Sequence, residues 1–130
     1  MNIEERAELA VARKAQGLCN CCQTVALALA DQTPLSEEQL RNMAAGFAVG
    51  MGNMEGTCGA LVAAVAVAGL QSEGRNTLRL ARQISEGFRS RSGAVVCREL
   101  KGSGSGQPLC SCEDCVRNAL RAYDEVVGLR

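Results

Sequence analysis

The stretch "CGALVAAVAVAGL", residues 58–70, decides the fold class of this chain. Its apolar run from Ala60 to Leu70 holds 11 residues, and since about 20 are needed to span a bilayer, it indicates a buried helix. Two phenylalanines and one tyrosine are the only aromatic residues. A core of alanine, valine and leucine suits closely packed helices better than sheets. The sequence therefore predicts an all-α fold.

Further helices are predicted on both sides of this run from apolar periodicity and capping residues. They cover about residues 3–16, 21–31, 36–49, 76–90 and 112–127. We expect a single compact domain over residues 1–130 with five to six helices. The Gly/Ser tract at 102–107 predicts a flexible linker before the last helix. The segment "AVVC" (94–97) is a candidate strand, but one strand cannot form a sheet.

The glycine-rich segment "GMGNMEG" (50–56) resembles a phosphate-binding loop in composition. It follows a helical pattern rather than a strand, and it lacks the Gly-Lys-Ser/Thr ending of such loops. We therefore interpret it as a tight connection between helices, with Met51 and Met54 packed against the core.

Composition excludes several classes of function. The net charge is zero and aromatic residues are scarce, which argues against nucleic-acid binding. The charged N-terminal stretch has no apolar segment typical of a secretory signal, so we expect a cytoplasmic location without membrane insertion. In that compartment, eight cysteines indicate metal binding or redox chemistry rather than a static disulfide framework. The absence of histidine excludes Cys–His pairs and imidazole ligands.

Three predicted helices begin with a capping residue followed directly by a cysteine: Asn20–Cys21, Thr57–Cys58 and Ser111–Cys112. The free N–H groups at a helix start stabilise an anion, so a thiol placed there has a lowered pKa. A cysteine that only fills the core gains nothing from this position. The pattern therefore predicts reactive or metal-binding thiols.

The other cysteines carry weaker signals. Cys97 follows the apolar segment 94–96 without a clear cap. Cys115 lies one helical turn from Cys112, close enough to resolve a disulfide in the manner of a C-x-x-C pair. Cys22 is more simply explained by packing, and for Cys19 packing and function are equally supported.

Four segments in this order resemble the C_GCAxxG_C_C family of small redox-active proteins. They are "NCCQTVALALAD" (20–31), "AAGFAVGMGNMEGTCGALVAAVAVAGL" (44–70), "GAVVCREL" (93–100) and "VRNALRAYDEV" (116–126), the last preceded by a cysteine at the head of its helix. The resemblance covers about residues 17–127. It implies a redox function carried by four characteristic cysteines.

The family's four cysteines match, position by position, Cys21, Cys58, Cys97 and Cys112, with Cys115 as the alternative for the fourth. The chain departs from the motif at Ala63, where the family has its second glycine. This departure is harmless if that glycine serves helix packing, but it alters the site if the glycine lets a ligand approach.

Three functions remain open. The first is thiol–disulfide exchange or electron transfer by a thiol–disulfide oxidoreductase acting on Cys21, Cys58, Cys97, Cys112 and Cys115, with an unidentified redox partner. The second is a zinc or iron–sulfur site held by the first four of these thiolates. A distant likeness to the non-haem domain of split-Soret cytochromes implies the cluster. The third is a helical interaction protein with structural cysteines, for which the Ala/Gly-rich helix 58–70 offers a homodimer surface.

Overall fold

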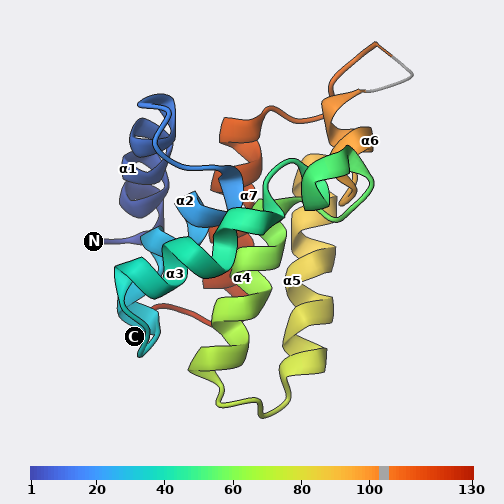
Figure 1. Ribbon diagram of the computed structural model, residues 1–130. Coiled ribbons are helices and arrows are strands. Elements are labelled where there is room, and N and C mark those ends of the chain that lie inside the picture. The colour runs from blue at the N-terminus through green and yellow to red at the C-terminus, as the bar shows by residue number, and fades with distance from the viewer. Residues whose placement is uncertain (103–105) are drawn as a thin grey trace.

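The computed structural model describes residues 1–102 and 106–130, and seven α-helices run through this part of the chain (Figure 1). The helices are α1 (Ile3–Ala15), α2 (Cys21–Ala28), α3 (Glu37–Ala44), α4 (Gly59–Gln71), α5 (Thr77–Ser92), α6 (Cys97–Lys101) and α7 (Cys112–Val126). The described residues contain no β-strand, and one isolated bridge joins Thr57 to Val96. The all-α prediction is confirmed.

The apolar stretch that predicted the fold class forms α4, whose buried side includes Ala60, Leu61 and Val67. Its small side chains let α2, α5 and α7 pack closely against it. Helix α7 also contacts α1 and α5, so it crosses behind α4 and connects both sides of the bundle (Figure 1). Ala63 is fully buried in this core and lies outside the cavity described below, so the departure from the family motif affects packing.

Several predicted boundaries need correction. The helix predicted to run to Asp31 ends at Ala28 and continues as a 3₁₀ turn over Ala30–Gln32. The next helix ends at Ala44 and is likewise followed by a 3₁₀ turn, over Ala45–Phe47. In both segments the apolar residues continue from the α-helix into the tighter 3₁₀ turn, so the apolar pattern does not show where the α-helix ends.

The number of helices was also underestimated, because α6 was not predicted. Val96 forms the isolated bridge, and the chain turns helical at once from Cys97. A helix of five residues is too short to show a 3.6-residue period. The linker predicted at 102–107 falls largely on residues 103–105, which lie outside the described residues, so it stays a prediction.

Candidate functional site

Five cysteines from four segments of the chain line one cavity of about 210 Å³. These are the five thiols singled out from the sequence: Cys21, Cys58, Cys97, Cys112 and Cys115. The remaining lining residues are Lys14, Asn20, Val49, Gly50, Gly59, Leu100 and Lys101. Figure 1 shows α6 and the start of α7 at the end of the bundle away from the α4–α5 turn.

The isolated bridge brings Cys58 and Cys97 to this cavity. The backbone N–H of Cys58 donates to the carbonyl of Val95 at 2.8 Å, and the N–H of Cys97 donates to the carbonyl of Gly56 at 3.0 Å. Two antiparallel segments are therefore tied together directly before the helices that they start. The bridge fixes the two thiols relative to each other although 38 positions of sequence separate the helix starts Gly59 and Cys97.

Two of the three predicted caps are confirmed. The side chain of Asn20 accepts the N–H of Gln23, whose side chain in turn accepts the N–H of Asn20, so Cys21 begins α2. Ser111 Oγ accepts the N–H of Asp114 at 3.1 Å, and Cys112 is the first residue of α7.

The third predicted cap is wrong by one residue. Cys58 itself is the N-cap of α4, which begins at Gly59. Its side chain makes no capping hydrogen bond, yet the backbone N–H groups of Ala60 and Leu61 are close enough to lower the pKa of its thiol. The cap position brings the sulfur nearer to these free donors than the first helical position would.

The surroundings of Cys58 favour its ionised form. Its pKa falls from 9.0 to about 6, chiefly because the thiol of Cys115 donates a hydrogen bond to it. Burial opposes this, since Cys58 is only 6% exposed, but the N–H groups of Ala60 and Leu61 and the charge of Lys101 add to the stabilisation of the thiolate. These contacts favour the thiolate of Cys58, which is the nucleophilic form of the side chain, inside the cavity.

Three other thiols of the cavity have a raised pKa instead, which favours their protonated form. The pKa of Cys115 is strongly raised, first because its thiol donates to Cys58 and second because it is buried. Burial also raises the pKa of Cys21 and of Cys97. The prediction that Cys21 has a lowered pKa at its helix start is therefore wrong, because desolvation of the thiolate outweighs the helix field.

Two lysines complete the polar part of the cavity. Lys101, at the end of α6, donates a hydrogen bond from Nζ to the sulfur of Cys112. Lys14 lies near the end of α1, and its charge favours the thiolate of Cys21. Both lysine residues are half-buried, so solvent screens their charges less than it would at the surface.

A strained segment forms one wall of the cavity. Val49, Gly50 and Met51 follow one another in the left-handed region, with φ of 52°, 53° and 65°. For a β-branched residue such as valine this conformation is a clear outlier. A Cβ on Gly50 would lie 2.5 Å from the Cβ of Cys97, so only glycine fits against that cysteine. The predicted burial of Met51 is wrong, since 59% of its surface is exposed.

Sequence reasoning overlooked Cys110. This thiol is 8% exposed and forms a hydrogen bond with Cys115, while Asn118 Nδ2 donates to its sulfur at 3.7 Å. It precedes the cap Ser111, so the capping argument passed over it. The cysteine alternation in "CSC" (110–112) was the available signal.

The other two cysteines lie outside the cavity lining. Cys22 is 2% exposed, and burial raises its pKa to about 12, as the packing interpretation implies. Cys19 is half-buried and accepts a hydrogen bond from Arg41 at 3.3 Å. Cys19 and Cys22 also share the C-x-x-C spacing.

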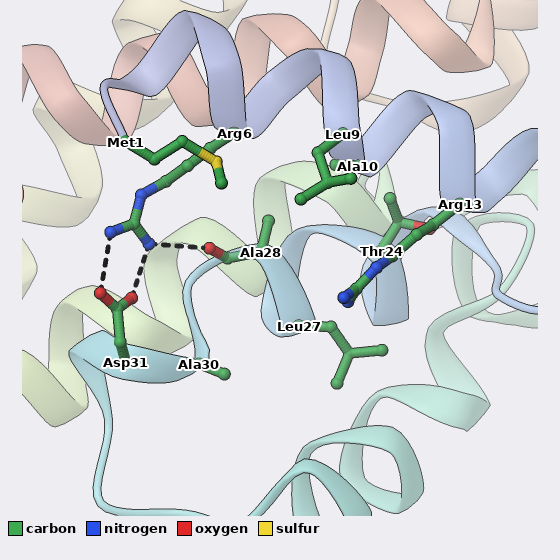
Figure 2. A pocket seen from close by; sticks show the side chains of 10 residues that line it. All are labelled: Met1, Arg6, Leu9, Ala10, Arg13, Thr24, Leu27, Ala28, Ala30 and Asp31. Carbon is green, nitrogen blue, oxygen red and sulfur yellow. Dashed lines mark hydrogen bonds and ion pairs between the residues drawn. The ribbon is translucent and has the colours of Figure 1, made fainter.

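A second cavity, of about 290 Å³, lies between α1 and the end of α2 (Figure 2). Arg6 spans one side of it, with Nη1 and Nη2 on the two carboxylate oxygens of Asp31 at 2.6 and 2.8 Å. Nη1 also donates to the carbonyl of Ala28 at 3.0 Å. Leu9 and Leu27 supply apolar walls (Figure 2). No cysteine lines this cavity in the described part of the chain, so the thiol chemistry belongs to the other one.

All eight cysteines are free thiols. Within residues 1–102 and 106–130, no three Cys, Asp or Glu side chains are grouped so as to hold a single metal ion. No helix in these ranges combines the length and apolar character needed to cross a bilayer.

Comparison with known proteins supports the thiol-rich character of this site. The model of the family described as "Putative redox-active protein (C_GCAxxG_C_C)" matches residues 19–126. Because the match covers most of the sequence, the chain belongs to this family. Neither the curated proteins nor the solved structures contain a match to the chain.

Proposed function

We propose that this protein is a dithiol oxidoreductase that reduces disulfides, with Cys58 as the nucleophile and Cys115 as the resolving thiol. The hydrogen bond between these two thiols is the observation that carries the proposal. It places a thiolate and a protonated thiol within hydrogen-bonding reach of each other, which is the arrangement that thiol–disulfide exchange requires. Membership of a redox-active family supports the same chemistry.

The proposed reaction has two exchange steps. The Cys58 thiolate attacks one sulfur of a substrate disulfide, the substrate S–S bond breaks, and the leaving thiolate takes a proton from water. Cys115 then attacks the Cys58 sulfur, forms the Cys58–Cys115 disulfide and releases the second substrate thiol, which takes the proton from Cys115. Two electrons pass from the protein dithiol to the substrate.

The burial of Cys115 determines which of the two thiols attacks the substrate first. Cys115 is 1% exposed, so it does not meet a substrate before Cys58 does. The order of attack follows from this difference in protonation and access, because only the thiolate is nucleophilic. Cys97 and Cys112 surround the pair in the same cavity, where they are available to continue the exchange.

The test uses protein purified without oxygen, 2-hydroxyethyl disulfide as the substrate, and mass spectrometry with peptide mapping. We expect the wild type to lose two hydrogens and to yield a Cys58–Cys115 peptide pair. Cys115→Ser should instead accumulate a mixed disulfide on Cys58. The control Cys22→Ser removes a buried thiol that lies outside the cavity and should behave like the wild type. Absence of any adduct on Cys58 would refute the proposal.

An iron–sulfur cluster is the second candidate, favoured by the convergence of five thiols from four segments. Cysteine thiolates are the usual ligands of such clusters, and Cys21, Cys58, Cys97 and Cys112 would hold one. Native mass spectrometry of the same oxygen-free sample decides between the candidates. Bound iron and sulfide, or zinc, would make the site a metal centre and displace the dithiol proposal.

A further inference from the structure

The chain has only two lysines, Lys14 and Lys101, and both line the cysteine cavity. The other basic residues are arginines, and four of them form surface ion pairs at 2.9 Å or less: Arg6, Arg91, Arg117 and Arg121. In the described part of the chain neither lysine pairs with a carboxylate. No carboxylate therefore neutralises either charge, although Lys101 Nζ already donates to the sulfur of Cys112.

The cavity offers no negative side chain to offset these charges apart from the thiols themselves. None of its described lining residues is Asp or Glu, although the chain as a whole is neutral. A lysine ammonium is a compact charge on a flexible stem, which can follow an anionic group as it enters. In a partly dry cavity such charges act more strongly than at the surface.

The size of the cavity limits what can enter. At about 210 Å³ it is smaller than the roughly 300–1,000 Å³ typical of sites for drug-sized ligands. Cys58 is 6% exposed, so the bond that it attacks must be brought into the cavity. These facts favour a compact molecule over the disulfide of a folded protein.

We propose that the substrates are small disulfides that carry carboxylate groups, held by Lys14 and Lys101 while Cys58 attacks. This inference rests on the proposed dithiol function. The carboxylate on one arm of the disulfide meets the ammonium groups, and its sulfur is thereby held beside the Cys58 sulfur. The same two charges also stabilise the thiolates, so the experiment must separate binding of an anion from activation of the nucleophile.

Three disulfides with identical two-carbon arms make this separation: 3,3′-dithiodipropionate, a dianion; 2-hydroxyethyl disulfide, which is neutral; and cystamine, a dication. Each rate is divided by the rate of the same disulfide with free 2-mercaptoethanol, which removes intrinsic reactivity. Of the three disulfides, cystamine is intrinsically the most reactive toward a thiolate, because its leaving thiol is the most acidic. A preference for the dianion thus cannot come from the leaving group.

We expect the dianion to react at least about tenfold faster than the neutral disulfide at low salt, within the range of electrostatic effects on association. Added salt should shrink the ratio. Lys14→Gln and Lys101→Gln should each reduce it toward one. Arg13→Gln, which removes an adjacent charge that lines the other cavity, should preserve it.

Two results would overturn the inference. If the lysine variants slow all three disulfides equally, the lysines act only on the thiolate. If the normalised rates do not depend on the charge of the disulfide, the cavity does not select anions. In both cases the neutral disulfide still reacts, so the dithiol function stands. If no disulfide reacts at all, the dithiol proposal itself has failed.

Discussion

Removing the thiol of Cys115 should abolish the acidity of Cys58. A pKa of about 6 instead of 9.0 means that the site stabilises the thiolate relative to the thiol by about 4 kcal/mol. At pH 7, such a thiol is about nine-tenths ionised, whereas one with a pKa of 9 is only about one-hundredth ionised. The hydrogen bond from Cys115 is the largest cause of the shift, and burial is its main opponent.

Two substitutions isolate this hydrogen bond. Cys115→Ala removes the donor, so burial of Cys58 is then opposed only by the N–H groups of Ala60 and Leu61 and by Lys101. We expect its pKa to rise well above 6. Cys115→Ser keeps an O–H donor in almost the same volume, so the pKa should stay much closer to the wild-type value.

The assay is the rate of iodoacetamide alkylation of Cys58, followed by peptide mass mapping from pH 4 to 10. The inflection of the profile reports ionisation even where a substitution changes access to the sulfur. At pH 7 we expect the thiolate fraction in Cys115→Ala to fall at least about tenfold below that in Cys115→Ser. Coincident profiles for the two folded variants, as judged by circular dichroism, would refute the assigned hydrogen bond.

Three further predictions concern stability. The free energy of unfolding of the reduced protein should rise from pH 6 to 9, because the unfolded chain still holds the Cys58 proton that the folded chain has released. It should fall above pH 9, where only the unfolded chain releases the Cys22 proton; urea titrations at each pH measure both slopes. Gly50→Ala should lower the free energy of unfolding by about 2–5 kcal/mol, because of its left-handed φ and its clash with the cavity wall. Gly52→Ala has a φ of 80° but open space around it, so it should lower the free energy of unfolding by only about 1–2 kcal/mol. Urea unfolding of the two variants measures this difference. The Tyr123 hydroxyl is buried without a partner among the described residues, so Tyr123→Phe should raise stability by about 1 kcal/mol in thermal unfolding, and a loss would reveal an unseen partner.

The features that could be predicted from the sequence are those that depend on a few neighbouring residues. The helix starts at Cys21 and Cys112 follow from caps that span four residues, 20–23 and 111–114, and such caps form regardless of distant contacts. The burial of the stretch 58–70 could likewise be predicted, because it follows from the apolar character of the stretch itself. The segment 94–97 was interpreted as a candidate strand because two adjacent valines favour a strand. The observed bridge and the short helix α6 instead depend on a partner segment near Thr57.

The cavity itself required long-range information. Lys14 and Lys101 have no shared motif, and only the packing of α1 against α2 and α7, with α6 nearby, brings them to the same cavity. The pairing of Cys58 with Cys115 is likewise invisible in the sequence, where Cys112 is the nearer partner of Cys115. The family resemblance narrowed the set of cysteines but left the choice between Cys112 and Cys115 open.

The three helix starts show that position at an N-terminus does not by itself make a reactive thiol. Cys21 occupies the first residue of α2, yet burial raises its pKa. Cys58 is more buried than Cys21 and still becomes acidic, because a directed hydrogen bond from Cys115 outweighs the cost of desolvation. The field of a helix spreads over its whole first turn, whereas a thiol donor acts on one sulfur atom. Cys58 and Cys115 thus behave as one unit that holds a single proton above about pH 6. The proposed nucleophile of this site is therefore selected by its partner rather than by its helix.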